Sequence, residues 1–112
     1  MFRCALTTLG CKVNQCETQA LAEMMKKNGY TIVDFDELAE VYIINTCCVK
    51  AEGERKSRQL VRRAVAKNSS AVIAVTGCAA QKAPELFYGI PGVSIVAGNT
   101  QKQNLPAMIL SG

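Results

Sequence analysis

Three of the six cysteines stand just after segments that have the apolar pattern of β-strands: Cys11, Cys47 and Cys78. They lie 36 and 31 residues apart, so no local motif such as C-x2–4-C joins them. Gly10 and Gly77 directly precede two of them, and glycine permits the tight turns that expose a thiolate. Thiolates are soft ligands that select iron–sulfur clusters, zinc or copper(I). The chemistry that this trio can perform is therefore ligation of a soft metal centre.

The chain contains no histidine, which excludes Ser-His-Asp and Cys-His catalysis and histidine-ligated zinc within it. Structural zinc usually takes four ligands, whereas three thiolates leave one coordination position open. The trio therefore favours a [4Fe–4S] cluster with three cysteine ligands and an open fourth iron that can bind an exogenous group. The sequence leaves a zinc-stabilised or thiol-redox regulatory domain as an alternative.

The elements that would position these cysteines alternate between strands and helices. Segments rich in β-branched and apolar residues indicate five strands, at Phe2–Thr8, Tyr30–Val33, 41–45, 71–76 and 93–97. Helical patterns occupy 17–28, Ala51–Lys67 and 84–88, and a last one covers 102–110. The alternation predicts an α/β fold, with an open, mainly parallel sheet of about five strands and helices on both faces, as in flavodoxin-like and Rossmann-like proteins.

In such a sheet the loops that follow the strands emerge at one edge, where ligands bind. Cys11, Cys47 and Cys78 follow the first, third and fourth predicted strands, so we expect the three thiols to converge there. Cys4 lies inside the first strand pattern and is interpreted as a core residue, because free cysteine is often buried. Cys16 and Cys48 are interpreted as incidental. A scaffold in which all six cysteines are buried is a further alternative.

The net charge of +4 is concentrated in one segment. Residues 50–67 carry seven cations and two acids. Arg55, Arg58 and Arg62 follow helical spacing and form one ridge, which predicts a possible contact with RNA phosphates. The alternative is an ordinary solvated helix face. No aromatic platform accompanies the ridge, so recognition of bases is not expected here.

The length of the chain indicates one domain, at residues 1–112. Its sequence also predicts a cytoplasmic protein. No apolar run approaches the roughly 18–20 residues that span a bilayer, and the amino terminus lacks the form of a signal peptide. We expect a monomer that does not bind membranes.

The stretches that carry the three cysteines, residues 8–15 (TLGCKVNQ), 45–47 (NTC) and 76–81 (TGCAAQ), resemble the signatures of one known domain. This is the amino-terminal domain of the radical-SAM methylthiotransferases, and the similarity covers nearly the whole chain. In that family the domain is α/β, and its three cysteines hold an auxiliary [4Fe–4S] cluster. The matching positions here are Cys11, Cys47 and Cys78.

Residues 9–15 and 54–59 are most similar to the branch that methylthiolates threonylcarbamoyladenosine in tRNA. Other branches act on isopentenyladenosine in tRNA or on a ribosomal protein. The resemblance implies a transferase that inserts a methylthio group into threonylcarbamoyladenosine next to the anticodon. Its partners would be tRNA and the protein's own radical-SAM domain.

The C-x3-C-x2-C motif of the radical-SAM domain does not occur in the chain. We therefore expect a second [4Fe–4S] cluster and S-adenosylmethionine on a radical-SAM domain outside this chain, together with an RNA-binding domain. By this interpretation the chain is cut off before those domains, contains no catalytic residue and is inactive alone.

Four polar residues near the cysteines are candidates for hydrogen bonds to cluster sulfurs: Asn14, Asn45, Thr46 and Gln81. The alternative is that they cap helices and shape loops. A nucleotide-binding module is a competing interpretation of the whole chain. However, residues 7–12 are only a weak match to a phosphate-binding loop, and the three cysteines would then go unexplained.

Overall fold

A computed structural model of the chain describes residues 2–8, 12–46, 51–77 and 85–97. Five strands form one sheet in the order β2-β1-β3-β4-β5, and all four pairings are parallel. The strands are β1 (Phe2–Thr8), β2 (Tyr30–Val33), β3 (Val41–Thr46), β4 (Val72–Gly77) and β5 (Ile95–Ala97). The helices are α1 (Lys12–Lys27), α2 (Ala51–Lys67) and α4 (Glu85–Tyr88).

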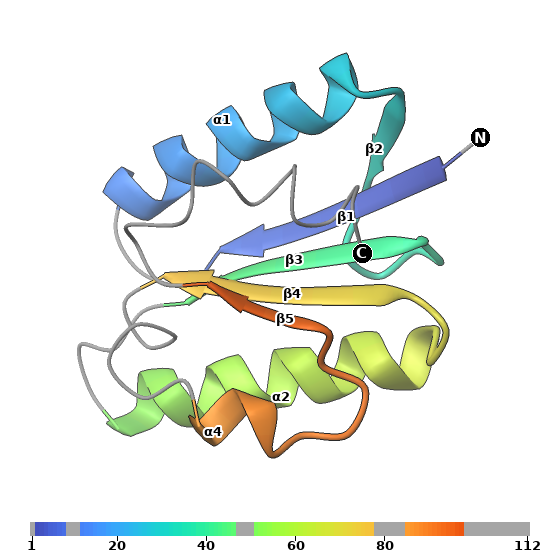
Figure 1. The fold of residues 1–112 in the computed structure, drawn as a ribbon. Coiled ribbons are helices and arrows are strands. Elements are labelled where there is room, and N and C mark those ends of the chain that lie inside the picture. The colour runs from blue at the N-terminus through green and yellow to red at the C-terminus, as the bar shows by residue number, and fades with distance from the viewer. Residues whose placement is uncertain (1, 9–11, 47–50, 78–84, 98–112) are drawn as a thin grey trace.

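The helices cover both faces of the sheet, with α1 on one side and α2 and α4 on the other (Figure 1). The prediction of an open parallel α/β sheet is therefore confirmed. The strand order 2-1-3-4-5 is the flavodoxin-like one, in which the chain reverses its direction of growth between β1 and β3. Ligands of such sheets bind beyond the carboxyl ends of the strands at that reversal.

Two apolar layers hold the helices to the sheet. The α1 side contains Leu21 and Met25 of the helix packed on Cys4 and Ile43 of the sheet, all buried. Of the described residues, twelve are buried in the layer under α2 and α4, among them Val61, Ala64, Tyr42, Ile44 and Phe87. Every residue of β3 is buried, because this central strand is covered on both faces, and its continuous apolar run predicted that position.

Most boundaries agree with the sequence patterns to within one or two residues, but α1 is longer than predicted. It begins at Lys12 rather than at residue 17, because its first turn carries polar residues that give no apolar periodicity. The helix predicted at 102–110 lies outside the described residues. Among the residues that the structure does describe, no helix combines the length and the apolarity needed to cross a bilayer.

The edge at the amino ends of the strands is closed by polar contacts. Arg3 donates from its backbone N to Glu40 Oε1 at 2.6 Å and from Nη2 to Oε2 at 3.1 Å. The Asn68 side chain donates to the Ala39 carbonyl at 2.9 Å, which attaches the end of α2 to the start of β3. These contacts leave the opposite edge, at the carboxyl ends, as the place to look for a ligand site.

Candidate functional site

The carboxyl ends of β1, β3 and β4 lie side by side and in register (Figure 1). Thr8 pairs with Asn45, and Asn45 pairs with Thr76 on its other side. Thr46 pairs with Gly77, the last residue of β4. The strands thus end at one level of the sheet, with the reversal between β1 and β3 included.

Each of these strand ends is followed closely in the sequence by one cysteine of the predicted trio. Cys47 comes directly after Thr46 and Cys78 directly after Gly77, whereas Cys11 comes three residues after Thr8. The three cysteines themselves, together with Cys48 and Gln81, lie outside the described residues. Their convergence on one ligand stays a prediction, and the alignment of the three strand ends is the observation that supports it.

A row of polar residues crosses the α1 face of the sheet at this edge. We name it the polar row: Thr8 of β1, Asn45 of β3 and Thr76 of β4, which are register partners. The preceding row on the same face, Leu6, Ile43 and Ala74, is apolar and belongs to the core. The change from apolar to polar side chains at the last row marks the edge as a site for a polar or charged group.

Thr18 of α1 binds two members of the polar row. Thr8 Oγ1 donates to Thr18 Oγ1 at 2.6 Å, and Asn45 Nδ2 donates to the same oxygen at 3.0 Å. These bonds tie α1 to the ends of β1 and β3. They also restrain both sides of the segment that carries Cys11, since Thr8 precedes it and Thr18 follows it.

Thr46 and Gly77 are register partners at the ends of β3 and β4. Thr46 Oγ1 donates to the Thr76 carbonyl at 2.7 Å, and Thr46 is fully buried. Gly77 has φ +102°, and a Cβ there would lie 2.4 Å from the Thr46 carbonyl oxygen and 2.7 Å from Asn45 Oδ1. Only glycine fits, which gives the Thr-Gly-Cys stretch a physical reason. This bond shapes the strand end, as the alternative interpretation of Thr46 expects, and a contact to a cluster stays a prediction.

One hydroxyl of the polar row has no partner. Thr76 is fully buried, and its Oγ1 makes no hydrogen bond. Buried hydroxyls almost always have a partner, so an orphaned one at a ligand edge suits an acceptor that binds there. Cluster sulfides are anionic acceptors, so this one hydroxyl suits an iron–sulfur cluster. Sequence reasoning missed Thr76, although the threonine that recurs near Cys11, Cys47 and Cys78 was a signal.

The other described cysteines behave differently from each other. Cys4 is fully buried in the α1 layer, which confirms its interpretation as a core residue, and burial raises its pKa to about 12. Its sulfur therefore stays a thiol at neutral pH and is a poor ligand. Cys16 is exposed on α1. Within the described ranges, no three side chains of His, Cys, Asp or Glu gather closely enough to hold a metal ion.

Asn14 lies in the first turn of α1. α1 and α2 both begin at the carboxyl edge of the sheet (Figure 1). Helix amino termini carry partial positive charge and favour anions nearby. The edge therefore combines the unpartnered Thr76 hydroxyl with two helix termini, which is an environment suited to a negatively charged group.

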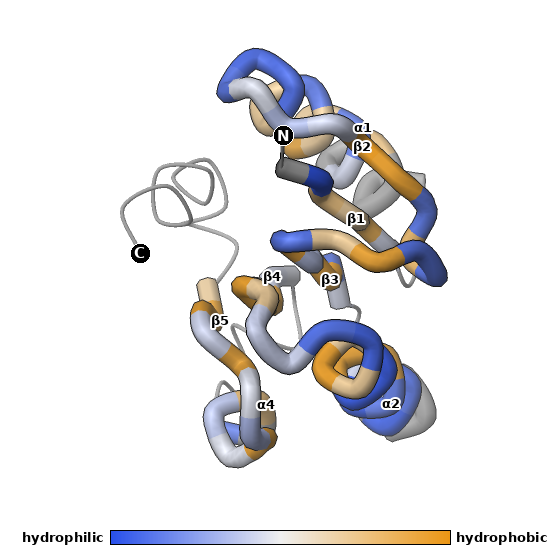
Figure 2. Tube along the Cα trace, turned by 90° about the vertical axis from the view of Figure 1, so that its right-hand side faces the viewer, coloured by the Kyte–Doolittle hydropathy of each residue, from blue (hydrophilic) through white to orange (hydrophobic). Residues whose placement is uncertain are grey.

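Figure 2 shows α2 with a hydrophobic side toward the sheet and a hydrophilic side away from it. Arg55 and Arg62 are exposed. Arg58 is half-buried, and its Nε is buried without a hydrogen-bond partner. Residues 55–67 contain no acid, and the two acids of the helix, Glu52 and Glu54, lie in its first turn.

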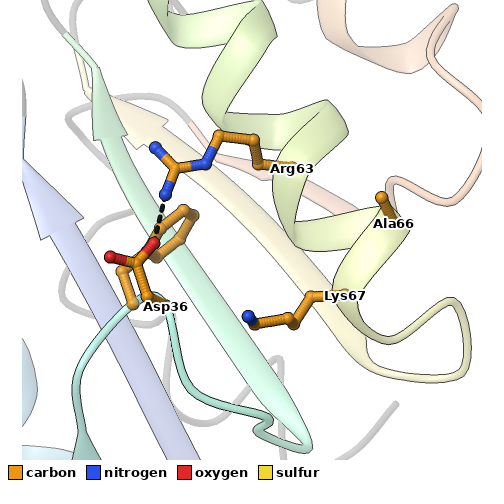
Figure 3. Close-up of a pocket in the computed structure, with 5 residues that line it drawn as sticks. Asp36, Arg63, Ala66 and Lys67 are labelled. Carbon is orange, nitrogen blue, oxygen red and sulfur yellow. Dashed lines mark hydrogen bonds and ion pairs between the residues drawn. The ribbon is translucent and has the colours of Figure 1, made fainter.

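A pocket of about 240 Å³ lies at the far end of α2 and is lined by Phe35, Asp36, Arg63, Ala66 and Lys67 (Figure 3). Arg63 forms an ion pair with Asp36, and its guanidinium carbon is 5.9 Å from the centre of the Phe35 ring. This pocket is at the opposite end of the helix from the strand ends that precede the cysteines. Among the predicted site residues that the structure describes, none lines it.

Comparisons with known proteins point to one family. A family model described as "Uncharacterized protein family UPF0004" matches residues 3–98. The threonylcarbamoyladenosine tRNA methylthiotransferase MtaB of Bacillus subtilis (strain 168) is 48% identical over 105 residues, which cover 94% of this chain and 23% of that protein. The protein of the same name from Aquifex aeolicus (strain VF5) is 41% identical over 104 residues, 93% of this chain and 25% of that protein.

A second group of relatives acts on a different nucleoside by name. The tRNA-2-methylthio-N(6)-dimethylallyladenosine synthase of Clostridium botulinum (strain Hall / ATCC 3502 / NCTC 13319 / Type A) is 35% identical over 107 residues, 90% of this chain and 24% of that protein. The chain thus spans about a quarter of the length of these relatives. The resemblance to methylthiotransferases, and to the threonylcarbamoyladenosine branch in particular, is confirmed.

Proposed function

Because the chain belongs to the family described as UPF0004, we propose that it is the cluster-binding part of a tRNA methylthiotransferase. In this proposal Cys11, Cys47 and Cys78 hold an auxiliary [4Fe–4S] cluster whose fourth iron is open. The protein that carries the chain inserts a methylthio group into threonylcarbamoyladenosine next to the anticodon. The observation that carries the proposal is the alignment of the ends of β1, β3 and β4, each shortly before one of these cysteines.

The choice of nucleoside rests on the relatives. Proteins named for threonylcarbamoyladenosine are 48% and 41% identical to the chain, whereas the dimethylallyladenosine relative is 35% identical. The second candidate is therefore methylthiolation of dimethylallyladenosine, which is another name for isopentenyladenosine. The two candidates share the cluster and differ in substrate.

Cys11, Cys47 and Cys78 would hold the cluster, which would supply the sulfur of the methylthio group. The chain's own residues hold and shield it. Thr18 fixes the ends of β1 and β3 through its bonds to Thr8 and Asn45. Gly77 lets β4 end against Thr46, so the segments after β3 and β4 start side by side. Fixed strand ends let three distant cysteines serve as ligands of one cluster without a sequence-local motif.

The basic face of α2 supports tRNA as the partner. Arg55 and Arg62 are exposed on a helix that begins at the carboxyl edge of the sheet. Phosphate contacts contribute most of the affinity of proteins for nucleic acids. We propose that these side chains neutralise tRNA phosphates beside the cluster while the base itself is recognised elsewhere.

The cluster is tested by anaerobic reconstitution of the 112-residue chain with iron and sulfide. We expect about four irons per chain with Mössbauer parameters of a [4Fe–4S] cluster. The triple variant Cys11→Ala, Cys47→Ala and Cys78→Ala should bind none. Cys16→Ala is the matched control, since it removes an exposed thiol of α1 and should leave iron uptake unchanged. Equal iron in the triple variant and the wild type would contradict the proposal.

The substrate is tested separately, in cells that lack the protein and are complemented with its complete gene. Mass spectrometry of tRNA nucleosides should show the methylthio derivative of threonylcarbamoyladenosine only after complementation. Appearance of the methylthio derivative of isopentenyladenosine instead would move the assignment to the second candidate without affecting the cluster.

A further inference from the structure

Thr76 occupies a singular position in the polar row. It is fully buried, is the register partner of Asn45 and lies on the same face of β4 as the core residue Ala74. Thr8 and Asn45 both donate to Thr18, whereas Thr76 Oγ1 has no hydrogen-bond partner. The backbone of Thr76 is satisfied, because its carbonyl accepts from Thr46 Oγ1. The orphaned group is the side-chain hydroxyl alone.

A hydroxyl without a partner is costly in this environment. Valine has the same shape and would fill the same space without leaving a buried polar atom unpaired. A threonine at this position therefore indicates that the hydroxyl has an acceptor in the working protein. The row ends at the carboxyl edge of the sheet, so an acceptor bound at that edge would be a neighbour of this hydroxyl.

The chain limits where that acceptor can be. Thr76 is two residues before Cys78, and its register partner Asn45 is two residues before Cys47. Two residues span at most about 7 Å of extended chain. A group held by the sulfurs of Cys47 and Cys78 would therefore lie close to the end of β4 that carries Thr76.

We infer that the Thr76 hydroxyl donates a hydrogen bond to a sulfur of the auxiliary cluster and raises its reduction potential. The inference rests on the proposed function and adds a residue that positions and tunes the cluster. Reduction adds negative charge to the cluster sulfurs, so a donated hydrogen bond stabilises the reduced form more than the oxidised form. Thr76 ligates no iron and is a positioning residue.

The test compares the wild-type chain with Thr76→Val, Thr76→Ser and Thr46→Val. Thr76→Val removes the hydroxyl at constant shape, and Thr76→Ser keeps it. Thr46→Val is the matched control, because it removes a neighbouring buried hydroxyl whose partner is already known. Each protein is measured twice, as the metal-free chain by thermal unfolding and after reconstitution by redox titration of its cluster.

In the metal-free chain, Thr76→Val should melt at the wild-type temperature or above, because the hydroxyl that it removes has no partner. Thr46→Val should melt about 4 °C or more below the wild type. In the reconstituted chain, Thr76→Val should have a lower midpoint potential than the wild type. The expected shift corresponds to an equilibrium constant for reduction of the cluster that is about tenfold smaller. Thr76→Ser should stay at the wild-type potential.

Three results would overturn the inference. A cluster with the same potential in Thr76→Val and in the wild type would show that the hydroxyl does not reach it, and the proposed function would stand. Clear destabilisation of metal-free Thr76→Val would show that the hydroxyl has a partner within the protein. If the wild-type chain takes up no iron, the proposed function fails and this inference fails with it.

Discussion

Gly77 meets Thr46 at a distance that no other residue would allow. A Cβ on Gly77 would lie 2.4 Å from the Thr46 carbonyl oxygen, which is backbone and cannot move aside as a flexible side chain could. The contact joins the last residues of β3 and β4, directly before Cys47 and Cys78. The geometry of this one pair therefore determines how closely the two segments that follow can begin.

Replacement of Gly77 by alanine should destabilise the protein strongly. The variant combines a clash with backbone and a φ of +102°, so we expect a loss of about 3 kcal/mol or more of unfolding free energy. Gly29→Ala is the matched control, since Gly29 has φ +92° with no atom within 4 Å of its Cβ position. It should lose only about 1–2 kcal/mol through the backbone conformation. Urea unfolding measures both, and equal losses would show that the contact with Thr46 is unimportant.

Cys4 should make the protein sensitive to alkaline pH. Burial raises the pKa of this thiol from 9.0 to about 12, so the folded state holds the proton where the unfolded state releases it. The stabilisation is fully present below pH 9 and is lost as the pH rises from 9 toward 12. The wild type should lose up to about 1.4 kcal/mol per pH unit more than Cys4→Ala in that window.

The measurement for Cys4 is urea unfolding of the wild type and of Cys4→Ala at pH 7, 9 and 10. For each protein, the unfolding free energy at pH 9 and 10 is compared with its own value at pH 7. Native alkylation provides a second readout at pH 8, where Cys16 is exposed and should react while Cys4 should not. Parallel loss of stability in wild type and Cys4→Ala would contradict the expected role of this thiol.

The sheet could be predicted from the sequence because its strands are short apolar runs between helical patterns. β3 shows this most clearly. Its nearly continuous apolar run predicted a strand covered on both faces, and all six of its residues are buried. The start of α1 at Lys12 could not be predicted, because its first turn gives no apolar periodicity. The helix is attached to the sheet through Thr18, whose partners Thr8 and Asn45 lie on two different strands. Such contacts depend on strand order, which no local pattern contains.

The candidate site was predictable in its cysteines and not in its supporting residues. Each of the three cysteines follows a predicted strand. Because the carboxyl ends of parallel strands lie at the same edge of a sheet, the sequence predicts that all three cysteines lie at that edge. Thr46 was expected as a possible cluster contact, and the structure finds its hydroxyl bound to the Thr76 carbonyl. Thr76 itself emerged only from the register, because burial and a missing partner are properties of the folded chain.

The Arg3–Glu40 pair should affect stability at acid pH. The hydrogen bond and charge of Arg3 hold the pKa of the Glu40 carboxyl below its ordinary value of 4.5. The contribution of the pair is therefore present above about pH 4.5 and is lost as the pH falls through the lowered pKa of the folded state. Glu40→Gln should unfold with a shallower dependence on pH between 5 and 3 than the wild type. Identical pH profiles in thermal unfolding would exclude this contribution.

The basic face of α2 should contribute to tRNA binding through charge alone. In the protein that carries this chain, Arg55→Ala with Arg62→Ala should weaken binding to different tRNAs by a similar factor. The slope of log affinity against log salt should fall by about 1.5, which corresponds to two lost phosphate contacts. Arg58 is left unchanged, because its half-buried side chain would add a loss of stability. Arg63→Ala is the matched control, since its charge on the same helix is already paired with Asp36. A salt slope unchanged in the double variant would show that this face is only solvated.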